Sequence, residues 1–219
     1  YAETLETLAQ DGNAERRVEL AEMADVCRRI AGAPPATFRE AIQLVWLVHV
    51  MGCLAEGSAL SLARFDQYLY PFYAADLSAG RLSREHAKEL VGCLWLKVNE
   101  PHMRIVQSVC LAGQTPDGQD AADELTDLCL EVCAELKQPY PNVSVRLGGQ
   151  SPEWLYDRVV ETIRVGIGHP MILNDDVWVP NLKRQGFPTH DARDYYNMGC
   201  AEILIQGGRA HWGPGGGVI

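Results

Sequence analysis

Basic residues are scarce in this sequence. Its 219 residues include 19 lysines and arginines against 29 aspartates and glutamates, which gives a formal net charge of −10 at pH 7. No basic stripe runs along the chain that could neutralise the phosphates of DNA or RNA. The composition therefore excludes nucleic acid as a partner and is typical of a cytoplasmic enzyme.

The sequence also lacks a long hydrophobic run. Its most apolar stretch, 41–55, is too short to span a bilayer and contains Gln43 and His49. The N-terminal residues are polar from the start, unlike a secretory signal peptide. We therefore expect no membrane association, and we interpret residues 42–53 as a helix buried on several sides.

Paired cysteine motifs are absent. The seven cysteines form no Cys-x-x-Cys pair, and Cys129 and Cys133 lie one helical turn apart with no histidine pattern beside them. This argues against a disulfide framework and against zinc.

Other ligand-binding motifs are absent as well. The run of residues 174–176, Asn-Asp-Asp, lacks the spacing of a calcium loop and favours helix capping or a turn. The glycine-rich stretch 207–217 matches neither a Walker loop nor a dinucleotide fingerprint. We expect no metal site.

Short apolar strands separated by helical stretches are what the sequence does contain. Strands are predicted over 104–111, 142–147, 170–173 and 195–198, with a connection of small residues over 57–64. Asp120 is predicted to cap a helix that ends near Lys137. Strands separated by helices are typical of a parallel sheet, either open or closed into a barrel. In such folds functional side chains collect where the strands end, and polar side chains follow the last two of these strands. They are Asn174, Asp175, Cys200 and Glu202.

The segment 194–202 has the features of a catalytic site. In an extended chain, residues two apart point to the same side, so Cys200 and Glu202 would place a thiol and a carboxylate in one cavity. Gly199 allows a tight turn just before the sulfur. The alternative is a packing thiol beside a solvated carboxylate. A nucleophilic pair of Cys200 with His169, His190 or His211 is also conceivable, but their spacing does not favour it.

Five motifs in order give the chain a resemblance to a known family. They are 35–43 (PATFREAIQ), 64–71 (RFDQYLYP), 117–125 (DGQDAADEL), 168–175 (GHPMILND) and 199–202 (GCAE). Together they resemble the glycyl radical enzymes related to pyruvate formate-lyase. The chain begins without methionine and has no closing element. Together with these two features, the resemblance implies that 1–219 is an interior segment of the catalytic domain, without the N-terminal part and the C-terminal glycyl radical domain.

The resemblance implies a helix-rich α/β fold that is part of a ten-stranded barrel, with Cys200 on a central loop. Cys200 would become the hydrogen-abstracting thiyl radical and Glu202 the general base. The candidate substrate-binding residues are Ser58, Asn174, Asp175 and His211. The cofactor would be a glycyl radical outside this segment, installed by a radical-SAM activating enzyme. The implied partners are this enzyme, a small-molecule substrate and a second copy in a homodimer.

The lone Cys200 followed by Glu202 resembles the dehydratase, eliminase and arylacetate decarboxylase branches of the family. We therefore expect a lyase that eliminates across a C–O, C–N or C–S bond of a small polar substrate. The alternatives are an arylacetate-type decarboxylase and a non-catalytic relative that acts as a binding or scaffold module. Two departures argue against glycerol, propanediol or choline as substrate. Serine and alanine follow Gly57 where those branches carry His-Ser, and the proline expected after Glu202 is Ile203.

Overall fold

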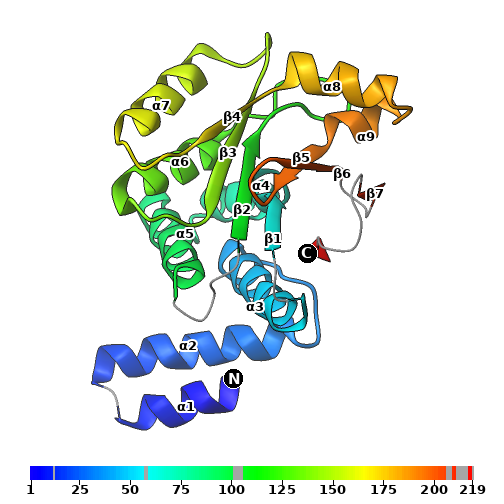
Figure 1. Cartoon of the computed structure of the whole chain (residues 1–219). Helices are drawn as coiled ribbons and strands as arrows, with labels where there is room; N and C mark the ends of the chain where they lie inside the picture. Colours follow the sequence, from blue (N-terminus) through cyan, green and yellow to red (C-terminus); the bar gives the residue numbers. More distant parts are fainter. Residues whose placement is uncertain (12, 57–58, 101–105, 206–208, 211–216, 219) are drawn as a thin grey trace.

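The computed structural model describes the whole chain except residues 12, 57–58, 101–105, 206–208, 211–216 and 219 (Figure 1). The helices are α1 (Ala2–Asp11), α2 (Ala14–Ile30), α3 (Phe38–Glu56), α4 (Phe65–Ser78), α5 (Arg84–Val98), α6 (Glu124–Leu136), α7 (Glu153–Arg164), α8 (Asp175–Arg184) and α9 (Thr189–Arg193). The strands are β1 (Ala59–Arg64), β2 (Val106–Ala112), β3 (Asn142–Leu147), β4 (Met171–Asn174), β5 (Tyr195–Met198), β6 (Glu202–Ile205), β7 (Arg209–Ala210) and β8 (Gly217–Val218).

A parallel sheet is the centre of the fold. Its five strands lie in the order β4-β3-β2-β1-β8, and neighbours within β1 to β4 are joined by helices. The connections are α4–α5 between β1 and β2, α6 between β2 and β3, and α7 between β3 and β4. This is the repeated strand–helix unit that the sequence predicts. The helix-rich α/β expectation is confirmed, and the sheet is consistent with part of a barrel.

The two faces of the sheet are covered differently. In Figure 1, α5, α6 and α7 lie on one side, and β5, β6, α8 and α9 lie on the other. Leu111, Val143 and Val145 point toward the helices and belong to the larger hydrophobic core. Ala63 and Cys110 point the other way, into a second core with Tyr195, Tyr196 and Leu204. The alternation along each strand therefore separates a helix-covered face from a face that holds the β5–β6 hairpin.

The prediction that 195–198 is a further strand of the parallel sheet is wrong. β5 pairs antiparallel with β6, and these two strands form a separate sheet with β7. β5 instead packs across β1 and β2, on the face of the sheet opposite α5, α6 and α7, which we call the inner face. Only three residues separate β5 from β6, a length that permits a hairpin but no crossover helix. The apolar character of the segment comes from this internal packing.

The stretch expected to be a connection, 57–64, contains a central strand. β1 lies between β2 and β8 in the sheet. Its small residues, Ser61 and Ala63, are almost fully buried. Small side chains are typical of loops, and for this reason the sequence predicts a connection here instead of a strand. Here they leave room for the hairpin to lie close to the sheet.

Two helix assignments also need correction. Asp123 rather than Asp120 caps α6, because the Asp123 carboxylate accepts the backbone N–H of Thr126 in a capping box. α3 is buried on one side, at Ala41 and Ile42, whereas Met51 is 70% and Leu54 is 81% exposed. Over the described residues, no helix is long and apolar enough to cross a membrane.

Candidate active site

Cys200 lies at the tip of the β5–β6 hairpin. Met198 and Glu202 are cross-strand partners, so the turn consists of Gly199, Cys200 and Ala201. Both Cys200 and Glu202 are exposed in this chain. The thiol and the carboxylate therefore project from one short turn. The structure brings these two predicted site residues together.

The Glu202 carboxylate is folded back over the turn. Its Oε2 atom accepts the backbone N–H of Ala201 at 3.1 Å. Hydrogen bonds from the backbone N–H groups of Glu202 itself and of Ala201 hold the pKa of Glu202 below its ordinary value. The side chain is therefore ionised at neutral pH, which is the state that a proton acceptor requires.

Gly199 suits this turn in two ways. Its φ of +62° lies in the left-handed region, where a side chain is strained. A Cβ atom there would also lie 2.5 Å from Glu202 Oε2, inside the van der Waals limit. The absence of a side chain thus gives Glu202 the space to fold over the turn beside Cys200.

Asn174 and Asp175 occupy a different part of the structure. Asn174 caps α8, because its Oδ1 atom accepts the backbone N–H of Asp176 at 2.9 Å. The capping that the Asn-Asp-Asp run favours is thereby confirmed. Asp175 is 1% exposed, and both of its carboxylate oxygens have partners. Arg146 donates to the two oxygens through Nε and Nη2 at 2.8 Å each.

Tyr195 joins Asp175 and Arg146 to the start of the hairpin. Its hydroxyl donates to Asp175 Oδ1 at 2.7 Å, and its carbonyl accepts from Arg146 Nη1 at 2.9 Å. The guanidinium carbon of Arg146 also lies 3.9 Å from the centre of the Tyr195 ring. The three side chains link β3, α8 and β5 in one buried cluster. The charge of Arg146 was the available signal in the sequence, since a charged residue inside an apolar strand needs a partner.

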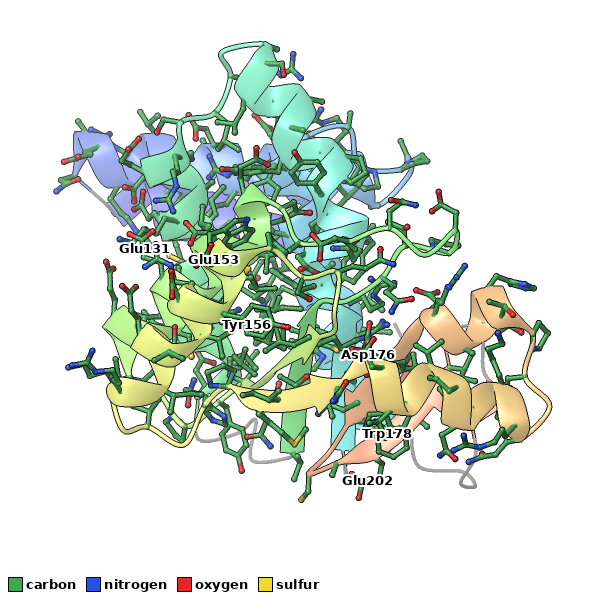
Figure 2. All side chains as sticks on the ribbon, turned by 90° about the horizontal axis from the view of Figure 1, so that it is seen from above. Glu131, Glu153, Tyr156, Asp176, Trp178 and Glu202 are labelled. Atoms are coloured by element: carbon green, nitrogen blue, oxygen red, sulfur yellow. The ribbon has the colours of Figure 1, made fainter. Side chains whose placement is uncertain are left out.

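Strand β5 runs opposite to the strands of the parallel sheet beneath it. Tyr195 contacts Arg146 near the C-terminal end of β3, whereas Asn197 contacts Ser108 near the start of β2. From Tyr195, β5 continues to Met198, about 10 Å further in extended chain, before the turn that holds Cys200. In Figure 2, Glu202 lies at the lower edge of the view, and Asp176 lies higher, at the start of α8. The structure therefore does not bring Asn174 and Asp175 together with Cys200 and Glu202.

The two other predicted substrate-binding residues, Ser58 and His211, lie outside the described residues. Within the described part of the chain, no group of three histidine, cysteine, aspartate or glutamate side chains is arranged to hold a metal ion.

The comparison with known proteins decides the family. The sequence profile of the family described as pyruvate formate lyase-like matches residues 1–218. This chain belongs to that family. Within it, the chain is 34% identical over 217 residues to isethionate sulfite-lyase of Nitratidesulfovibrio vulgaris, covering 91% of this chain and 26% of the relative. It is 37% identical over 227 residues to the probable dehydratase YbiW of Escherichia coli, covering 95% and 28%.

The fold agrees with this membership of the pyruvate formate lyase-like family. The chain superimposes on the crystal structure of a glycyl radical enzyme from Archaeoglobus fulgidus with a TM-score of 0.87. The two sequences are 37% identical, and the match covers 94% of this chain and 29% of that one. The chain thus spans between a quarter and a third of the length of the proteins it matches. The family resemblance is confirmed, and the parallel sheet is consistent with the partial barrel that the resemblance implies.

Proposed function

We propose that the protein containing this chain is a glycyl radical lyase that eliminates a leaving group from a small polar substrate. One observation carries the proposal. Cys200 and an ionised Glu202 project from a glycine-dependent turn, on a hairpin held against the inner face of a parallel sheet. The printed names of the similar proteins, a sulfite-lyase and a probable dehydratase, support elimination as the reaction class.

The two side chains have separate tasks in this proposal. Cys200 would give up the hydrogen atom of its thiol to a glycyl radical outside this segment, which would supply the radical for the reaction. The Cys200 sulfur then takes a hydrogen atom from a substrate carbon that bears a hydroxyl group. Glu202 accepts the proton of that hydroxyl, so that a carbonyl forms while the bond from the neighbouring carbon to its leaving group breaks. Cys200 returns its hydrogen atom to that neighbouring carbon, and the radical is regenerated.

The position of the turn suits this chemistry. A sulfur radical must be kept from water and from other reductants, and a barrel interior provides such a place. The hairpin lies on the face of the sheet that would line that interior. We further infer a cytoplasmic homodimer that is activated by a radical-SAM enzyme, in line with the family.

The proposal is tested in the intact protein, activated anaerobically by its radical-SAM enzyme. Cys200→Ser should retain the glycyl radical signal in electron paramagnetic resonance and lose turnover, because an O–H bond is too strong for the hydrogen relay. Glu202→Gln should retain the radical and slow turnover by about 10²–10⁴-fold. Cys93→Ser is the matched control, since Cys93 is also an exposed cysteine but lies on α5.

A panel of compounds separates the alternatives. Isethionate, (2S)-3-sulfopropanediol and trans-4-hydroxy-L-proline test elimination. 4-Hydroxyphenylacetate tests the decarboxylase. Release of carbon dioxide from the last compound alone would replace elimination by decarboxylation. Full activity of Cys200→Ser would overturn the radical mechanism at this residue. The glycyl radical loop of this family has the pattern Arg-Val-x-Gly-Tyr. Such a motif encoded after residue 219 supports an enzyme, and a stop codon there supports a scaffold.

A further inference from the structure

Asn197 is the residue of the hairpin that is most closely attached to the sheet. It lies in β5, three residues before Cys200, and it is 1% exposed. Its carbonyl oxygen accepts the Ser61 hydroxyl at 2.9 Å and lies 3.3 Å from the Ser108 hydroxyl. Its side-chain Oδ1 atom accepts the Ser144 hydroxyl in a short hydrogen bond. Both oxygens of Asn197 are therefore used.

The three serines form a row across the sheet. They come from the neighbouring strands β1, β2 and β3. Ser61 is the direct partner of Ser108, whereas Ser144 is opposite Cys110, two residues further along β3. Each is at most 1% exposed. A buried hydroxyl costs free energy unless it is hydrogen-bonded, and an apolar side chain would fill the same space without that cost. The hydroxyls of Ser61 and Ser144 also reach a carbonyl oxygen of the neighbouring strand, Ser108 O at 3.4 Å and Val109 O at 3.1 Å. What the three hydroxyls share is that each also reaches an oxygen of Asn197.

The backbone alone does not fix where the hairpin lies. Among the described residues, β5 pairs with β6, and β6 with β7, but neither pairs with a strand of the parallel sheet. Side-chain contacts must then set how far along the sheet the hairpin sits. A slide of one residue would move the turn by about 3.3 Å and exchange the faces of β5. Such a displacement exceeds the tolerance of a reacting group.

We propose that Asn197, held by Ser61, Ser108 and Ser144, is a positioning residue that sets the place of Cys200 relative to the sheet. The proposal rests on the catalytic role proposed for Cys200. The buried cluster of Arg146, Asp175 and Tyr195 attaches the start of β5. The serine row attaches it close to the turn, where a small displacement affects the sulfur most.

The test compares two ways of removing buried hydroxyls from the intact protein. The double variant Ser108→Ala/Ser144→Ala removes two donors to Asn197 while keeping the rest of each side chain. Thr162→Val is the matched control, because the Thr162 hydroxyl is also buried but donates to Arg158 O within α7, at 2.8 Å. Amide hydrogen exchange over 195–205 should accelerate on the order of tenfold in the double variant and stay unchanged in the control.

Turnover gives the second readout, with the panel compound that the protein consumes. The double variant should lower kcat by about 10–10²-fold and leave KM within about twofold, with an unchanged glycyl radical signal. Equal hairpin exchange in both variants, or faster exchange with unchanged kcat, would overturn the proposal. Where the double variant fails to fold, Ser144→Ala alone is compared with Thr162→Val in the same measurements. Amide hydrogen exchange over 195–205 tests the attachment of the hairpin whether or not Cys200 is catalytic. Full activity of Cys200→Ser would therefore refute the proposed function without deciding this proposal.

Discussion

At the scale of single residues, Asp123 carries the clearest consequence for pH. Asp123 caps α6 and lies close to the fully buried Asp66, with which it shares the Thr126 hydroxyl. Burial and the nearby charge of Asp66 raise the pKa of Asp123 to about 7. The folded protein therefore retains a proton that the unfolded chain releases near its ordinary pKa of 3.8. Stability supplied by this proton is lost as the pH rises from about 4 to about 7.

Burial also raises the pKa of Asp66, so the two carboxyls share this effect. Asp123→Asn should remove the part of the loss that Asp123 contributes. Asparagine keeps the capping acceptor and carries no charge, so the variant should match the native protein near pH 4. It should exceed the native free energy of unfolding by about 1–3 kcal/mol at pH 8. Urea unfolding at a series of pH values measures the difference. Asp117→Asn is the control, because the Thr115 hydroxyl lowers the pKa of that exposed carboxyl and the native slope should persist. A parallel offset of the Asp123→Asn curve at all pH values would contradict the prediction.

At this scale the sequence predicts the placement of Cys200 and Glu202 on one turn, but not the placement of Asn174 and Asp175 away from it. The pairing of Cys200 and Glu202 follows from their spacing and from Gly199, and both features are local. The grouping of Asn174 and Asp175 with them assumed that β5 lies parallel to β4. Strand direction is a tertiary property that the short apolar segment does not reveal. The partners of Asp175 are Arg146 and Tyr195, which lie 29 and 20 residues away and carry no shared local pattern.

At the scale of elements, the hairpin turn depends on Gly199. Gly199→Ala should cost about 1–2 kcal/mol through its left-handed backbone and should push the Glu202 carboxylate off the turn. Turnover should then fall well beyond what the lost stability explains. Gly166→Ala is the matched control, since Gly166 has a φ of +81° but no atom within 4 Å of an added Cβ. Equal turnover in the two variants would show that the turn tolerates a side chain.

The buried ion pair that joins β3, α8 and β5 gives a second prediction at this scale. Arg146 and Asp175 are at most 1% exposed, so removing one partner leaves the other charge buried and unpaired. Arg146→Met should therefore cost about 3–5 kcal/mol in the free energy of unfolding. The double variant Arg146→Met/Asp175→Leu should recover most of this loss, because no charge remains without a partner. Denaturant unfolding of the single and double variants measures both values, and additive losses would refute the coupling.

At the scale of the whole molecule, the sequence predicts the class of fold better than its connections. The strands β2, β3 and β4 and the intervening helices follow from periodicity and caps. β1 was missed because its small residues make room for a hairpin that packs from far along the chain. The sequence also does not predict the limited burial of α3. An apolar helix indicates that its side chains need partners, but not whether those partners lie within these 219 residues. Both errors concern contacts between distant parts, which periodicity does not encode.

The open edge of the sheet gives the last prediction. β4 pairs with β3 on one side, and no described strand pairs with its other edge. Apolar side chains are exposed on this strand and on α7, at Ile172 (51%), Val160 (54%) and Ile163 (42%). An unpaired edge beside exposed apolar surface favours association between copies. The 219-residue chain expressed by itself should therefore self-associate as its concentration rises.

Ile172→Lys should weaken this association, because a charge on an edge strand opposes pairing between copies. Sedimentation velocity over a concentration series measures the effect. Val18→Lys provides the control, since Val18 is 60% exposed but lies on α2, outside the sheet. If the edge and its apolar neighbours are the contact surface, only the β4 substitution shifts the chain toward the monomer. Equal shifts in both variants would place the contact elsewhere, and a native chain that stays monomeric would refute the prediction itself.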